Sequence, residues 1–140
     1  MLSQTEDATL GHMALMLALE AKSLDGTYND ASIQLAIWLA AGLEKMRELA
    51  SLPIIDDEIQ DDRLMPFVGL TVVGHQWELH IAVKSANVNV NIYGPVSIGD
   101  TRTYYGVFQI LHVLAKINKW GRRAYYPWLI NKVLQPLHSY

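Results

Sequence analysis

Two neighbouring runs decide the fold of this chain: Leu15-Met-Leu-Ala-Leu-Glu-Ala-Lys-Ser23 and, after a short polar turn, Ile33-Gln-Leu-Ala-Ile-Trp38. The first run is continuously apolar until it ends in Glu-x-Lys, which is typical of a short strand buried on both faces. A helix is the competing interpretation, because Met, Ala and Leu are good helix formers. The turn signal Leu-Asp-Gly-Thr follows at once and favours a strand over residues 11–22.

The second run lies on a predicted helix from Asn29 or Asp30 to about Leu49, since its apolar residues recur at helical spacing. Either polar residue can cap the start, and Pro53 ends the pattern. Five acids follow within residues 56–62. Their spacing does not match an EF-hand loop, so we expect a solvated loop there.

From Pro66 onward the hydrophobic period changes from helical spacing to two, which predicts strands. We expect strands over residues 67–73, 77–84 and 88–92, with a turn at Gly74-His75-Gln76 and an end at Gly94-Pro95. The last two of these runs alternate cleanly between apolar and polar residues. They therefore predict an antiparallel hairpin with one face in water.

The end of the chain carries two expected helices. Asp100 or Thr101 can cap the first, Gly121 is expected to break it, and Pro127 suits the first turn of the last helix. The predicted order is strand, helix, three strands and two helices. This order indicates an α/β (α+β) fold, with a mixed sheet of about four strands and three helices in a single domain over residues 1–140.

Length and composition narrow the class of protein. The chain has 140 residues, 51% of them hydrophobic, which is enough for one domain with a proper core. It has no cysteine, which excludes disulfides and thiolate metal sites and fits an intracellular protein, cytoplasmic or nuclear. No apolar run approaches the roughly 18 residues that cross a bilayer, so we expect no membrane partner. Acids before Met13 argue against a signal peptide.

Charge is distributed unevenly along the chain, although the net charge is only −3. Residues 1–100 hold all 14 acids and carry −9, whereas residues 101–140 hold no acid and carry +6. The basic C-terminal helices can contact a nucleic acid or pair with the acidic part of the same protein. Six basic residues over two helices can make few contacts to phosphates, which favours their pairing with acids of the same protein.

The first run also suggests chemistry. Glu20 and Lys22 project to the same side of the predicted strand, because residues two apart share a face. A carboxylate there can hold Mg²⁺ or Mn²⁺, and an ammonium can orient water or neutralise charge on a phosphate. Gln34 can direct its amide toward the same point from the next helix. The three side chains suit metal-assisted phosphodiester hydrolysis; the alternative is an exposed ion pair of little energetic value.

Several ordered stretches carry a family resemblance: Ser3–Thr5, Ala18-Leu-Glu-Ala-Lys-Ser23, Ala31-Ser-Ile-Gln-Leu-Ala-Ile-Trp38, Leu70-Thr-Val-Val-Gly-His-Gln-Trp77, Tyr105-Gly-Val-Phe-Gln-Ile-Leu111, Trp120 and Pro127-Trp128. Together they resemble the PD-(D/E)XK nuclease-like domain found widely in fungal proteins. The resemblance implies a hydrolase with a restriction-endonuclease-like fold. It also implies that Glu20 and Lys22 are the (D/E)XK pair and that Gln34 is the polar residue of the next helix.

The chain departs from this family at its start, where the usual upstream helix and Asp-bearing strand are missing. We therefore expect an N-terminally shortened core. Asp7, 13 residues before Glu20, is the candidate second metal ligand beside Glu20, although no Pro precedes it. The resemblance then implies either a metal-dependent nuclease that uses Mg²⁺ or Mn²⁺ or a catalytically degenerate derivative.

A turn histidine and an alternative function complete the hypotheses. His75 belongs to a Gly-His-x-Trp turn that the resemblance includes, and its role is either structural or catalytic.

The fold can also be repurposed as a metal-free enzyme or binding protein for a small organic molecule in a fungal biosynthetic pathway. Its groove would be lined by Trp38, Trp77 and Tyr104, with Glu20, Lys22 or His75 as general acid or base.

A third hypothesis concerns association. A shortened core would leave one edge of the sheet open, and open edges are usually covered or paired. We therefore predict a homodimer.

Overall fold

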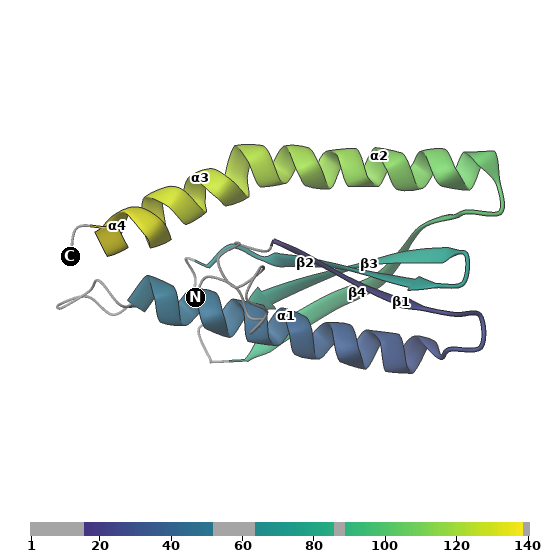
Figure 1. Ribbon diagram of the computed structural model, residues 1–140, viewed down its shortest axis with the longest axis horizontal. Helices are drawn as coiled ribbons and strands as arrows, with labels where there is room; N and C mark the ends of the chain where they lie inside the picture. Colours follow the sequence, from purple (N-terminus) through teal and green to yellow (C-terminus); the bar gives the residue numbers. More distant parts are fainter. Residues whose placement is uncertain (1–15, 52–63, 86–88, 139–140) are drawn as a thin grey trace.

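The computed structural model describes residues 16–51, 64–85 and 89–138. Within these ranges a four-stranded sheet lies between two long helical runs (Figure 1). Helix α1 (Tyr28–Ser51) covers one face of the sheet, and helix α2 (Tyr104–Trp120) covers the other. The mixed sheet with flanking helices confirms the predicted α+β class.

The strands are β1 (Leu17–Lys22), β2 (Phe67–Val73), β3 (Gln76–Lys84) and β4 (Val90–Asp100), and they lie in the order β1-β2-β3-β4. β1 pairs with β2 in parallel, whereas β2–β3 and β3–β4 are antiparallel. A parallel pair needs a crossover connection, and α1 supplies it between β1 and β2. The predicted antiparallel hairpin of β3 and β4 is confirmed, but the face expected in water is wrong for β3, because His80 and Lys84 are buried against α1 whereas Ile81 is exposed.

Two apolar clusters hold the layers together, one on each face of the sheet. Phe67 faces α1 and packs with the buried leucines of that helix, while the next residue, Val68, faces α2. This alternation follows from the pleat of the strand. The α1 cluster also includes Tyr125 and Leu129, because the C-terminal helical run reaches around to α1 at one end of the sheet.

The C-terminal helices form one continuous run, so the predicted break at Gly121 is wrong, and the described residues hold two helical runs where three were expected. After α2 the run comprises π-helical turns η2 (Gly121–Tyr125) and η3 (Leu129–Leu134), with α3 (Tyr126–Trp128) between them and α4 (Gln135–His138) at the end. Gly121 keeps helical angles, with φ −55° and ψ −47°. A Cβ there would clash with the Met16 side chain. The glycine therefore serves close packing and not helix termination.

Two strand predictions also need correction. β1 is not buried on both faces: in the described sheet it is an edge strand, and Leu19 is 51% exposed. β4 does not end at Gly94-Pro95 but continues to Asp100, with an irregularity opposite His80. Pro95 is tolerated because β4 lies at the other edge of the described sheet, where a missing backbone donor costs little.

Candidate functional site

Three of the predicted site residues form a polar cluster at the end of β1. The Lys22 ammonium donates a hydrogen bond to Gln34 Oε1 at 2.9 Å and lies 3.2 Å from Glu20 Oε1. The Lys22 and Glu20 side chains are about one quarter exposed, at 27% and 24%. Both are therefore shielded from water yet still reachable by a ligand.

The local fold explains how these side chains meet. Residues of β1 alternate between the faces, so Ala18 packs into the α1 cluster and Glu20 and Lys22 project to the same side. A tight turn follows, in which the Gly26 N–H donates to the Ser23 carbonyl at 2.9 Å. A Cβ on Gly26 would lie 2.6 Å from Lys22 Cβ, so only glycine lets the chain double back so closely. α1 then begins at once and carries Gln34 to Lys22.

A row of polar side chains continues from Glu20 across the sheet. Glu20 lies opposite Thr71 on β2, and Thr71 lies opposite Glu78 on β3. The buried Thr71 hydroxyl is 3.0 Å from His80 Nε2 and donates to Glu78 Oε2 at 3.4 Å. Burial lowers the pKa of His80 below its usual value, although nearby Glu78 acts in the opposite direction. Burial of His80 therefore favours the neutral form of its imidazole.

This polar row was not predicted from the sequence. The alternation along β3 did place Glu78 and His80 on one face, and that was the available signal. The spacing of residues in the sequence does not indicate the parallel register of β1 on β2, which brings Glu20 level with Thr71.

The described residues do not complete a site for Mg²⁺ or Mn²⁺. Among residues 16–51, 64–85 and 89–138, no group of three or more His, Asp or Glu side chains is placed to hold a metal ion. Glu20 and Glu78 lie on strands separated by β2, about 10 Å apart at the strand spacing. Mg²⁺ demands several oxygen ligands in near-octahedral geometry. The second predicted ligand, Asp7, lies outside the described residues.

His75 lies beside the cluster and not within it. Its Nδ1 is 2.8 Å from Thr101 Oγ1, and the Thr101 N–H donates to the His75 carbonyl at 2.9 Å. These bonds tie the β2–β3 turn to the end of β4, which agrees with the structural interpretation of this residue. The ring is exposed and also lines a hollow of about 320 Å³ together with Tyr28 and Arg102.

The aromatic residues expected to form a small-molecule groove are not brought together. Trp38 lies on α1 and Tyr104 begins α2, and these helices cover opposite faces of the sheet (Figure 1). Trp77 packs against the apolar cluster beneath α2. These three side chains therefore do not line one common groove.

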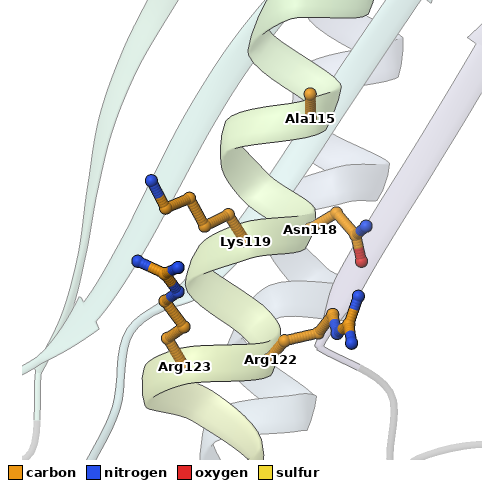
Figure 2. Close-up of a pocket in the computed structure, with 5 residues that line it drawn as sticks. All are labelled: Ala115, Asn118, Lys119, Arg122 and Arg123. Atoms are coloured by element: carbon orange, nitrogen blue, oxygen red, sulfur yellow. The ribbon is translucent and has the colours of Figure 1, made fainter.

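A basic surface lies on the C-terminal helical run. Figure 2 shows Lys119 and Arg123 extending to one side of the helix and Asn118 and Arg122 to the other. Together with Ala115 they line an open hollow of about 380 Å³. Among the residues that the structure describes, no acid forms an ion pair with Lys119, Arg122 or Arg123. The internal pairing expected for these bases is thus not found in that part of the chain.

Comparison with known proteins adds one match. The family described as the PD-(D/E)XK nuclease superfamily matches residues 1–126, a range that contains all four strands, α2 and the Glu20 cluster. No curated protein and no solved structure matches the chain. Among the described helices, none has the length and apolar character that a membrane span requires.

Proposed function

Because the chain belongs to the PD-(D/E)XK nuclease superfamily, we propose that it acts on the phosphodiester backbone of a nucleic acid at the cluster of Glu20, Lys22 and Gln34. One observation carries this proposal. The Lys22 ammonium is held from two sides, by a carboxylate at 3.2 Å and by an amide oxygen at 2.9 Å. A cation fixed in this way is preorganised for an anionic substrate.

The proposed chemistry follows from the donors and acceptors of the cluster. An ammonium has three N–H donors; Lys22 donates one to Gln34, and its ion pair with Glu20 at 3.2 Å can occupy a second. The third donor can bind a phosphate oxygen and stabilise negative charge that develops there. A carboxylate accepts hydrogen bonds, so Glu20 can orient a water molecule and take its proton.

The basic surface supports a nucleic acid as the substrate. Met16 contacts Gly121, next to Arg122, and Glu20 lies four residues farther along the same chain segment. Four strand residues span about 13 Å, which equals about four phosphate spacings along one nucleic-acid strand. The basic surface therefore adjoins the segment of β1 that leads to the Glu20 cluster, although Glu20 itself projects toward α1 and α2 covers the opposite face of the sheet.

Binding and cleavage assays test this proposal. The full chain is incubated with DNA and RNA, with Mg²⁺, with Mn²⁺ and with a chelator, and both complex formation and products are followed. We expect salt-sensitive binding that Lys22→Met weakens, and any cleavage to be lost in Glu20→Gln and in Lys22→Met. Lys45→Met, which removes a lysine of α1 outside the cluster, is the matched control.

Binding without cleavage would identify a member of the superfamily that retains the site but not the hydrolysis. A protein that neither binds nor cleaves any of these nucleic acids would contradict the proposal.

A further inference from the structure

The hollow beside the Glu20 cluster has the size and the lining of a ligand site. It lies between the start of α1, the β2–β3 turn and the residues that follow β4, and its volume is about 320 Å³. Binding sites for small ligands begin at about 300 Å³. The hollow therefore suits one nucleotide-sized group.

Contacts place this hollow directly next to Lys22. Gly26 lines the hollow and lies against the Lys22 side chain, since a Cβ added to this glycine would lie 2.6 Å from Lys22 Cβ. The Gly74 N–H donates to the Lys22 carbonyl at 3.1 Å, which fixes the β2–β3 turn to the end of β1. A phosphate bound at Lys22 would thus have its own nucleotide within reach of the hollow.

The walls of the hollow are fixed by bonds outside it. The Arg102 guanidinium donates to both Asp100 carboxylate oxygens, at 3.0 Å through Nε and 2.6 Å through Nη2, which orients its planar group. The hydrogen bond of His75 Nδ1 to Thr101 at 2.8 Å likewise fixes the imidazole. The imidazole is exposed, and His75 also lines the hollow.

The chemistry of the lining matches a nucleobase. Leu24, Val73 and the ring of Tyr28 offer apolar contact, and Tyr28 is 38% exposed. His75, Gln76 and Arg102 add hydrogen-bonding groups. A flat aromatic ring with polar edges is the ligand that such a combination of stacking surface and edge contacts recognises in single-stranded nucleic acids.

We infer that this hollow binds one unpaired base of the nucleic acid, adjacent to the phosphate at Lys22, with Tyr28 as its stacking surface. The inference rests on the proposed function and names the substrate class: single-stranded segments or unpaired ends. A base within a duplex cannot enter a hollow of this kind without being unstacked and unpaired, at a cost in binding. Intact duplex is therefore the weaker ligand.

Equilibrium binding by fluorescence anisotropy tests the inference. The probes are a short single-stranded DNA and a covalently closed duplex of the same sequence without free ends. We expect the single strand to bind more tightly. Tyr28→Leu should weaken single-strand binding about 5- to 150-fold, the range for loss of one base–aromatic stack. Tyr93→Leu, at an exposed tyrosine of β4 away from the hollow, is the matched control and should leave binding unchanged.

A second measurement uses the wild-type protein and so does not depend on a variant that folds correctly. A single strand containing 2-aminopurine should change its fluorescence on binding to the wild-type protein, because the base moves into contact with Tyr28. Thermal unfolding of Tyr28→Leu verifies that the variant is folded.

These outcomes distinguish failure of the inference from failure of the proposed function. Equal affinity for both probes, together with equal effects of Tyr28→Leu and Tyr93→Leu, would overturn the inference. If Lys22→Met still weakened binding in that case, the proposed function would stand. Absence of binding to either probe would overturn both.

Discussion

The Lys22 ammonium lies 2.9 Å from the side-chain oxygen of Gln34, although the two residues belong to different elements, β1 and α1. The tight turn at Gly26 brings them together, since the chain reverses directly over the Lys22 stem. Glu20 holds the same ammonium from the strand. The position of the cation therefore depends on both elements, and this dependence can be tested residue by residue.

Replacing Gln34 should affect ligand binding more than folding. Gln34→Leu removes one exposed hydrogen bond to a charged group, so we expect nucleic-acid affinity to fall about fivefold, equivalent to about 1 kcal/mol. The melting temperature should change little, because the residue is exposed. Gln109→Leu, an exposed glutamine of α2, is the control. An affinity equal to that of the control would contradict a positioning role for Gln34.

The Glu44–Lys84 ion pair should stabilise the fold. Lys84 Nζ lies 2.7 Å from Glu44 Oε2, and the lysine side chain is only 2% exposed. Glu44→Gln leaves this buried ammonium without its negative counter-charge, and we expect a loss of about 1–3 kcal/mol in the free energy of unfolding. This is below the ~3–5 kcal/mol for a fully buried pair, because Glu44 remains partly in water. Urea denaturation measures the difference, with Glu48→Gln, an exposed pair, as control.

The same pair predicts a pH dependence. Hydrogen bonds from Arg47 and then from Lys84 lower the pKa of Glu44 from 4.5 to about 2. A lowered pKa in the folded state contributes stability above the unfolded value that is lost as the pH falls toward the folded value. The stability difference between wild type and Glu44→Gln should therefore shrink between pH 4.5 and about 2. A difference that stays constant across this range would contradict the assignment.

His80 should make the fold less stable in mild acid. Desolvation lowers the pKa of its imidazole below 6.5, so below that pH the unfolded chain binds a proton that the folded protein resists. The free energy of unfolding should fall as the pH drops below 6.5. His80→Gln should flatten that slope. An unchanged slope, followed by chemical denaturation at several pH values, would exclude His80 as its source.

Tyr125 should be the most costly aromatic residue to truncate. Its side chain is fully buried and contacts Phe67, Trp120 and Trp128 at ring-centroid distances of 5.9, 5.6 and 5.7 Å. Tyr125→Ala should lower the free energy of unfolding by about 3–5 kcal/mol. Tyr105→Ala, at a 73% exposed ring of α2, should cost much less in the same thermal or urea denaturation experiment. Equal costs for the two variants would contradict the packing described for Tyr125.

Local patterns predicted much of this structure. The change from helical spacing to a period of two located β2 and β3, and the turn after Lys22 separated β1 from α1. The predicted cluster of Glu20, Lys22 and Gln34 is present because it depends on one strand, one short turn and one helix. Interactions of this kind are encoded within a short segment and can be derived from its residues.

Features that depend on distant packing were not predicted. Gly121 suggested a helix end, but Met16, more than a hundred residues earlier, occupies the space beside it and the helix continues. The row from Glu20 through Thr71 depends on the register of two parallel strands joined by a long helix. Neither relationship can be recognised from neighbouring residues in the sequence, because Met16 and Gly121 are separated by most of the chain and Glu20 and Thr71 by the crossover helix.

The central claim is that Lys22 binds a phosphate of a nucleic acid, and the salt dependence of binding tests it most directly. Each phosphate contact by a basic residue contributes about 0.7–0.9 to the slope of log affinity against log salt concentration. We predict that Lys22→Met lowers this slope by about one such unit relative to wild type, whereas Lys45→Met leaves it unchanged. An identical slope for wild type and Lys22→Met, or no nucleic-acid binding at any salt concentration, would contradict the account.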